Sequence, residues 1–219
     1  MLRKLTIGPL DLAVGLAALL AIASQMAGLD PVHWGAKPLT TLLILLIALR
    51  GVPLAGAVYR RWIALGLVFG LAGDIFLMLP GDWFLFGLVA FLLNHLAYLR
   101  ALTRDAPLLA RPEAVALFAL AGLGMLAALW PGLPAGMGAP VVAYAAVLAA
   151  MAAQAAIRAT VLATDPARWA ALGGVLFMAS DAVLAINRFR FDVPASSILV
   201  LGSYFAAQWL FARSAAGRG

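Results

Sequence analysis

The chain has 219 residues, of which 65% are hydrophobic and only 11% are charged, and its mean hydropathy is +1.04. Soluble domains carry about 25% charged residues, so this composition excludes an ordinary soluble globule and is typical of a protein that crosses the membrane several times. The absence of cysteine excludes a disulfide framework and a cysteine nucleophile. The net charge of +6 could suggest nucleic-acid binding, but in a membrane protein it reports loop orientation, and we expect no nucleic-acid partner.

The first predicted element follows Arg3 and Lys4, a start that also occurs in signal peptides. We interpret the apolar run as an uncleaved membrane span, because it is long enough to cross and Asp11 would be unusual inside a signal peptide. Seven further apolar segments follow near the ~20 residues that a span requires, separated by Gly, Pro and Asp. The sequence therefore predicts an all-α integral membrane protein, a bundle of about eight transmembrane helices in a single domain over residues 1–219. The predicted spans are 9–27, 36–50, 61–79, 84–101, 112–130, 139–158, 167–187 and 195–213.

Basic residues divide unevenly between the two ends of these spans. Because cytoplasmic loops are enriched in Lys and Arg, we expect both termini in the cytoplasm and a location in a bacterial inner membrane. The residues on the basic side are Arg3, Lys4, Arg50, Arg60, Arg61, Arg100, Arg104, Arg111, Arg158, Arg168, Arg213 and Arg218. The exceptions on the other side are Lys37, Arg188 and Arg190.

Two predicted spans resemble each other. Spans 61–79 and 167–187 run in the same direction, and each carries one acid at a similar depth, Asp74 in "LAGDIFL" and Asp181 in "MASDAVL". The acids are 107 residues apart, about half the chain. This spacing favours a parallel four-plus-four repeat of helices.

Polar side chains inside the predicted spans are the candidate functional residues, because ionisable groups in a membrane are costly to insert. Helical spacing places them in one stripe on each of spans 61–79, 84–101, 167–187 and 195–213, which predicts one polar cavity between these four. Any single acid could serve only to bond a neighbouring helix, but two at matched depth favour a functional site. The inventory is Lys37, Asp74, Asn94, His95, Tyr98, Ser180, Asp181, Asn187, Ser203, Tyr204 and Gln208.

Metal and cofactor sites are not expected. Only two histidines exist, and His33 lies outside the polar stripes, in a position that we interpret as interfacial. The sequence also contains no phosphate-binding glycine loop and no nucleophile elbow. We therefore expect no metal and no cofactor.

Five segments in register carry a family resemblance: "KPLTTLLILL" (37–46), "GDIFLML" (73–79), "FLFGLVAFLLNHLAYL" (84–99), "FMASDAVLAINRF" (177–189) and "SYFAAQWLFARS" (203–214). Together they resemble the YhhN-like lysoplasmalogenase family over nearly the whole chain. The resemblance implies an eight-span membrane hydrolase with a lysophospholipid substrate. Such an enzyme cleaves the vinyl ether of lysoplasmalogens to a fatty aldehyde and a glycerophospho-ethanolamine or -choline. The motif positions that it carries over are Lys37, Asp74, His95, Tyr98, Ser180, Asp181, Asn187, Tyr204 and Gln208.

This chemistry suits the inventory. Vinyl ether hydrolysis begins with proton transfer to carbon and continues with capture of an oxocarbenium ion by water, which requires one protonated acid and one carboxylate. Two carboxyl groups that share a buried site do not readily ionise together. We therefore predict that Asp74 and Asp181 form the acid–base pair, in an order that the sequence leaves open. His95 would relay protons or orient an Asp, and Tyr204 and Gln208 would hold water.

The exceptional cations suggest a second role. Lys37 and Arg188 lie at the outer ends of polar spans, and Arg188 is two turns beyond Asp181, so we predict that both hold a phosphate at the cavity mouth. Two other classes of protein stay open: a proton-coupled small-molecule transporter that uses the same acids, and a non-catalytic protein whose polar stripes only join helices. The absence of clearly broken helices in the sequence argues against the transporter.

Overall fold

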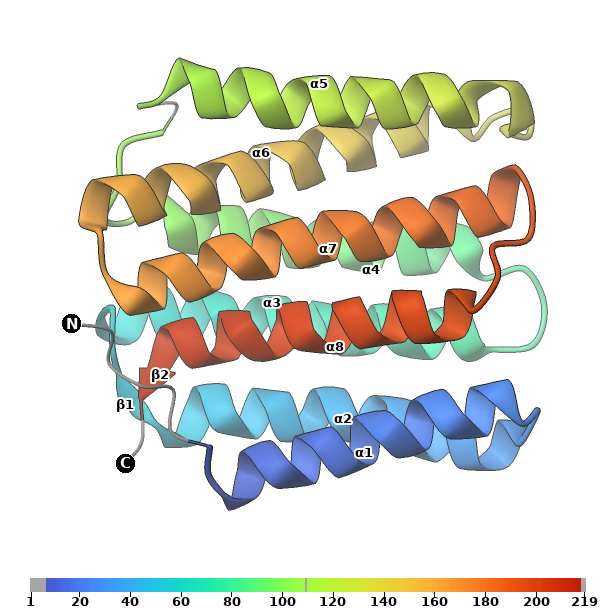
Figure 1. Cartoon of the computed structure of the whole chain (residues 1–219), viewed down its shortest axis with the longest axis horizontal. Helices are drawn as coiled ribbons and strands as arrows, with labels where there is room; N and C mark the ends of the chain where they lie inside the picture. The colour runs from blue at the N-terminus through green and yellow to red at the C-terminus, as the bar shows by residue number, and fades with distance from the viewer. Residues whose placement is uncertain (1–6, 109, 218–219) are drawn as a thin grey trace.

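The computed structural model describes residues 7–108 and 110–217, and this part of the chain forms a bundle of eight α-helices (Figure 1). Two short strands, β1 (Val52–Pro53) and β2 (Ala216–Gly217), pair antiparallel at one end of the bundle. The predicted all-α class is confirmed. The helices are α1 (Pro9–Met26), α2 (Asp30–Arg50), α3 (Gly56–Met78), α4 (Phe84–Leu102), α5 (Pro112–Leu129), α6 (Gly138–Leu162), α7 (Asp165–Phe189) and α8 (Ser196–Ala215), with a 3-10 turn at Trp130–Gly132.

The first seven helices are long and apolar enough to cross a membrane, so the protein is an integral, multi-pass membrane protein. The predicted eighth span corresponds to α8, which has 20 residues but carries Tyr204, Gln208 and Arg213. Helix α8 packs against α7, α2, α1 and α3 in the middle of the bundle (Figure 1). Its polar side chains therefore face protein, where partners offset their cost.

Two of the predicted spans start several residues later in the sequence than the helices of the structure. Helix α2 begins at Asp30 rather than at residue 36, and α3 begins at Gly56 rather than at residue 61. Pro31 lies in the first turn of α2, where its missing N–H removes no helical hydrogen bond. The Asp30-Pro31 pair therefore starts a helix instead of separating two, and Lys37 lies two turns inside α2.

The packing order of the helices is the same in both halves of the chain. Helices α1, α2, α3 and α4 pack in sequence, as do α5, α6, α7 and α8. The contact of α2 with α8 in one half matches that of α6 with α4 in the other. A four-plus-four repeat would give this arrangement, and the repeat itself stays a prediction.

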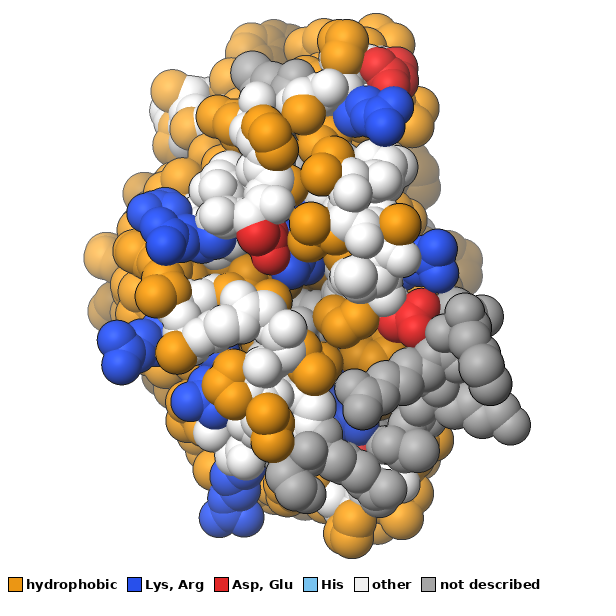
Figure 2. Space-filling view, turned by 90° about the vertical axis from the view of Figure 1, so that its left-hand side faces the viewer, with side chains coloured by type: hydrophobic (Ala, Val, Ile, Leu, Met, Phe, Trp, Pro, Cys, Tyr) orange, Lys and Arg blue, Asp and Glu red, His pale blue; other side chains and the backbone are white. Residues whose placement is uncertain are grey.

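Positive side chains gather at the end of the bundle that carries the strands (Figure 2). Nine of the twelve residues assigned to the basic side lie in the described part of the chain, close to helix ends on this side. Arg3, Lys4 and Arg218 lie outside the described residues. The side of the membrane that this end faces stays a prediction.

Candidate active site

Asp74 lies fully buried on α3, on a face that its glycines open to neighbouring helices. A Cβ on Gly70 would stand 2.6 Å from Gln208 Nε2 on α8, and a Cβ on Gly73 would stand 2.6 Å from the Phe91 ring on α4. The absence of these side chains lets α4 and α8 approach α3 closely. The glycines of the GLAGD segment therefore place Asp74 among polar groups from other helices.

Three side chains contact the Asp74 carboxylate. Lys37 Nζ lies 3.4 Å from Oδ1, so the buried acid has a cationic partner from α2. Thr41 Oγ1, also on α2, donates a hydrogen bond to Oδ2 at 2.6 Å, and Tyr204 OH on α8 donates to the same oxygen at 2.8 Å. A cation and two donors form an environment that suits an ionised carboxylate.

A chain of hydrogen bonds continues behind Tyr204. Gln208 Nε2 donates to the Tyr204 hydroxyl at 3.3 Å, and Gln208 Oε1 accepts a short hydrogen bond from Tyr98. All three side chains are buried. Tyr98 and Gln208 therefore orient Tyr204, which is the member of the chain that reaches Asp74.

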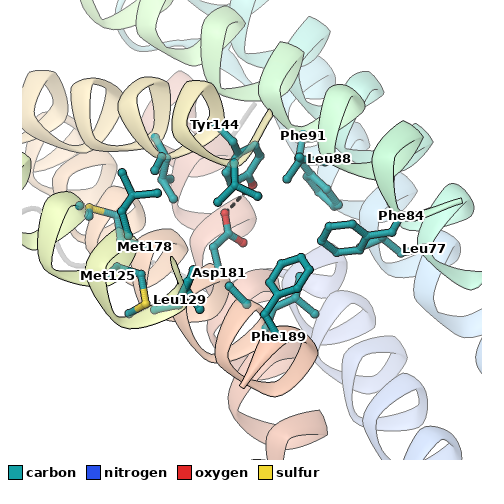
Figure 3. Close-up of a pocket in the computed structure, with 18 residues that line it drawn as sticks. Leu77, Phe84, Leu88, Phe91, Met125, Leu129, Tyr144, Met178, Asp181 and Phe189 are labelled. Atoms are coloured by element: carbon teal, nitrogen blue, oxygen red, sulfur yellow. Dashed lines mark hydrogen bonds between the residues drawn. The ribbon is translucent and has the colours of Figure 1, made fainter. Parts of the chain in front are cut away.

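Asp181 on α7 has a different set of partners. Tyr144 OH on α6 donates a hydrogen bond to Asp181 Oδ2 at 2.5 Å (Figure 3). The same hydroxyl lies 2.9 Å from His95 Nε2 on α4, and His95 Nε2 is 3.5 Å from Asp181 Oδ2. The His95 ring packs edge-on against Phe177, with the ring centroids 4.6 Å apart. The second acid is thus held by a tyrosine and a histidine, and its side chain keeps 14% exposure.

Two cavities meet at Asp181. The first, which we call the polar pocket, has a volume of 260 Å³ and is lined by both acids and Lys37. Because a water molecule needs about 10–15 Å³ of such space, the polar pocket can hold several. The second, the apolar pocket, lies between α4, α5, α6 and α7, and in its lining Tyr144 and Asp181 supply the polar side chains (Figure 3). The residues that line both are Leu77, Phe91, Asp181 and Leu184.

The structure brings most of the predicted site residues together. The predicted residues that line the polar pocket are Lys37, Asp74, Ser180, Asp181, Asn187 and Tyr204. His95, Tyr98 and Gln208 lie behind this lining as partners of Tyr144 and Tyr204. Two of the lining residues also make structural hydrogen bonds: Ser180 Oγ donates to Val200 O of α8 at 3.0 Å, and Asn187 Oδ1 accepts from Val193 N, in the loop after α7, at 2.9 Å.

Arg188 lies apart from this group. Its guanidinium is half exposed, forms an ion pair with Asp82 at 3.3 Å and lies 5.1 Å from the centre of the Phe84 ring. Neither pocket has Arg188 in its lining. Two turns of helix separate Arg188 from Asp181, but its side chain extends toward the loop after α3 instead of the cavity.

Sequence reasoning missed three residues of the site. Tyr144 stands in an alanine-rich span and shared no polar stripe, yet it precedes Asp181 by 37 residues, as Lys37 precedes Asp74. This equal spacing of 37 residues is the feature of the sequence that could have identified Tyr144 as a partner of Asp181. Thr41 is one turn after Lys37 on the same face of α2. His33, interpreted as interfacial, is buried, lines the polar pocket and has Nδ1 2.9 Å from Ala21 O.

Among the described residues, no group of three His, Asp or Glu side chains is placed to hold a metal ion. The fold and the site define a multi-pass helical membrane protein with a buried Asp74 in a polar pocket and a partly buried Asp181 where that pocket meets an apolar one. A model of the YhhN family matches residues 32–215, and the chain belongs to this family, as the resemblance in its sequence predicted.

Several named proteins are similar to this chain. "Lysoplasmalogenase" of Mycobacterium tuberculosis is 37% identical over 158 residues, which cover 69% of this chain and 59% of that protein. Human "Lysoplasmalogenase TMEM86A" is 37% identical over 158 residues, covering 70% and 64% respectively. "Uncharacterized membrane protein YhhN" of Escherichia coli O157:H7 is 29% identical over 204 residues, covering 93% and 96%. The chain thus spans less than two thirds of the lysoplasmalogenases that it matches, and no solved structure matches it.

Proposed function

We propose that this protein is a lysoplasmalogenase that hydrolyses the vinyl ether bond of a membrane lysophospholipid. The observation that carries the proposal is the position of Asp181 where the polar and apolar pockets meet. In a lysoplasmalogen, the vinyl ether joins the alkenyl chain to the glycerol unit that carries the phosphate headgroup. The names of the mycobacterial and human relatives support the same activity.

The reaction consumes one water. A protonated carboxyl group gives its proton to the carbon of the double bond that is remote from the ether oxygen, which leaves an oxocarbenium ion. Water adds to the cationic carbon and loses a proton to a carboxylate, and the resulting hemiacetal collapses to the aldehyde and the free hydroxyl of the glycerol unit. The two carboxyl groups of the site supply these roles, in the way that glycosidases use a pair of acids.

The surroundings of the two acids suggest how the roles divide. Asp74, beside the Lys37 ammonium and two donors, suits the carboxylate that activates water in the polar pocket. Asp181 faces the apolar pocket, and among the described residues no Lys or Arg forms an ion pair with it. Its one potentially cationic partner there is His95, whose Nε2 lies 3.5 Å away. Asp181 is therefore the proton donor. After each turnover, the proton that Asp74 accepted from water leaves through the polar pocket, and Tyr144 and His95 return one proton to Asp181.

Phosphate binding falls to Lys37. Its side chain lines the polar pocket, whereas Arg188, assigned the same role from the sequence, is paired with Asp82 outside it. Asp30, Ser196 and Ser197 also line the polar pocket, at the helix ends opposite the strands. A headgroup would therefore enter from that end of the bundle.

The test is release of a fatty aldehyde from a lysoplasmalogen by the purified protein in detergent or nanodiscs. Wild-type protein should release aldehyde and the glycerophospho base in equal amounts, and the doubly substituted Asp74→Asn, Asp181→Asn protein should not. A folded wild-type preparation that releases no aldehyde from ethanolamine or choline substrates would rule out the proposal.

Proton-coupled transport uses similar residues but fits the helices less well. The helices that carry the acids, α3 and α7, are continuous over their 23 and 25 residues, whereas transporter sites are typically built from broken helices. The same purified protein reconstituted in vesicles distinguishes the two. Proton uptake driven by a solute gradient, without aldehyde release, would favour the transporter.

We also propose that both termini face the cytoplasm of a bacterial cell, on the basis of the positive side chains at the strand end of the bundle. A reporter that is active only outside the cytoplasm should be silent when fused after Gly219 and active when inserted near Pro134. The reverse pattern would show that the orientation is inverted.

A further inference from the structure

One end of the polar pocket carries side chains that have no role in the proposed reaction. This end, which we call the pocket mouth, is lined by Gln25 of α1 and by Asp30, His33 and Trp34 of α2. It lies where α1 turns into α2, at the end of the bundle opposite to the strands (Figure 1). An amide, a carboxylate, an imidazole and an indole thus line the same cavity as Lys37.

Helical spacing places these groups in order along α2. Asp30, Trp34 and Lys37 recur every three or four residues, so they lie on one face of the helix. Lys37 follows Asp30 by seven residues, a rise of ~10 Å. Helical side chains lean toward the N-terminus, so the long Lys37 side chain shortens this separation. The face therefore presents a carboxylate, an aromatic ring and an ammonium group, in that order from the mouth inward.

The pocket mouth is rich in hydrogen-bond acceptors. His33 Nδ1 lies 2.9 Å from Ala21 O, and a backbone carbonyl can only accept a hydrogen bond, so Nδ1 carries the ring proton. Nε2 of the neutral ring is then an acceptor. Asp30 stands in the first turn of α2, where the helix dipole favours a negative charge. The mouth therefore suits a cation that donates hydrogen bonds.

We propose that Asp30, His33 and Trp34 bind the ammonium group of an ethanolamine headgroup. This inference rests on the proposed function, in which Lys37 holds the phosphate of the same lipid, and it names the headgroup that the site selects. Two carbons separate the amine from the phosphate ester in ethanolamine lipids. The order of amine, phosphate and vinyl ether follows the order of Asp30, Lys37 and Asp74 into the pocket. Each charge of the headgroup then meets a side chain of opposite charge.

A primary ammonium group suits the pocket mouth better than a quaternary one. Ethanolamine has three N–H donors for Asp30 and His33, whereas the trimethylammonium group of choline has none. Quaternary ammonium groups are typically held in cages of aromatic rings, but at the mouth α2 supplies the half-exposed Trp34. A site built for hydrogen bonds discriminates against an analogue without the donors, so the wild-type protein should prefer ethanolamine over choline ~5-fold in kcat/KM.

Substitution of Asp30 tests this with substrates that differ only in the headgroup. Asp30→Asn keeps the size of the side chain and removes its charge. Asp192→Asn is the matched control, because Asp192 is exposed in the loop after α7, at the same end of the bundle, and lies outside the lining of the polar pocket. The substrates are the ethanolamine and choline lysoplasmalogens and an alkenyl glycerophosphate, which has no amine. A general folding defect would act on all three alike.

Asp30→Asn should lower kcat/KM ~10-fold on the ethanolamine substrate, mainly through KM, but by no more than about threefold on choline and about twofold on the glycerophosphate. His33→Asn keeps a donor for Ala21 O and removes the acceptor at Nε2, so it should lower the ethanolamine-to-choline ratio ~3-fold. Asp192→Asn should leave this ratio unchanged. An equal loss on all three substrates in Asp30→Asn, or a wild-type preference for choline, would overturn the assignment.

Binding without turnover separates this inference from the proposed activity. Non-hydrolysable alkyl-ether lysophospholipids with the same three headgroups are titrated into the protein in nanodiscs. Wild-type protein should bind the ethanolamine analogue ~5-fold more tightly than the choline analogue, and Asp30→Asn should remove the difference. That result without aldehyde release would refute the activity alone. Aldehyde release with equal binding of both analogues would refute the ammonium site alone.

Discussion

The two acids of the site, Asp74 and Asp181, are contacted from corresponding helices but by side chains of different chemistry. Asp74 on α3 is contacted from α2 and α8, and Asp181 on α7 is contacted from α6 and α4, which are the corresponding helices of the other half. Lys37 and Tyr144 stand at the same offset before the two acids. A lysine in one half and a tyrosine in the other therefore give equivalent carboxyl groups different partners.

Exposure also distinguishes them. The Asp74 side chain is fully buried and lines the polar pocket, whereas Asp181 is 14% exposed and lines both pockets. A paired, enclosed carboxylate is suited to hold one charge state, and a carboxyl group at the edge of an apolar cavity can meet a hydrocarbon substrate. The two carboxyl groups therefore have different surroundings although they are contacted from corresponding helices.

Asp181→Asn should have the largest effect. Loss of the proton donor should lower kcat by about 10³-fold, within the range of general acid catalysis, while the protein still folds because Asn keeps the size and can bond Tyr144. Single-turnover aldehyde release measures this. Near-native release would remove Asp181 from the mechanism and end the proposed division of roles.

Asp74→Asn should cost both activity and stability. Turnover should fall ~10²-fold, and the buried Lys37 loses its partner, which destabilises by about 3 kcal/mol. Adding Lys37→Met should restore the melting temperature without restoring turnover. Recovery of both by the double variant would mean that the pair is structural only.

The two tyrosines sharpen the comparison further. Tyr144→Phe should lower kcat by about tenfold or more, because Tyr144 links Asp181 to His95. Tyr204→Phe should lower it less, since Asp74 keeps Lys37 and Thr41. Steady-state kinetics of both variants decide the point, and a greater loss in Tyr204→Phe would argue for reversed roles of the acids.

The two cations should show the smallest effects on kcat. Lys37→Gln should raise KM about tenfold with a lesser change in kcat, because Gln can still donate to Asp74 while the charge facing the phosphate is lost. Arg188→Gln should change either constant by less than about twofold, since exposed ion pairs contribute little. An equal rise in KM for both would support the two-residue phosphate clamp that the sequence predicted.

Much of the fold followed from local patterns. Apolar segments of span length predicted the helices, and GDIFLML and MASDAVL marked the helices that carry the acids. The start of α2 was wrong because Asp30-Pro31 fits a helix N-terminus as well as a loop. Tyr144 escaped notice because an isolated tyrosine in an alanine-rich helix is locally the same whether it faces lipid or an acid.

By itself, the sequence determined the class of protein, the family and the spans that carry the two acids. Hydropathy and polar residues within a span are local properties, which can be recognised in a segment of a few helical turns. Only the tertiary structure decided which groups meet each acid, since Lys37, Tyr144 and Tyr204 reach them from other helices. The tertiary structure also decided where the Arg188 side chain points. Arg188 shares a helix with Asp181, but its guanidinium contacts Asp82, 106 residues away in the chain. Helical spacing fixes the face of a side chain, and the packing of neighbouring helices fixes what that face meets.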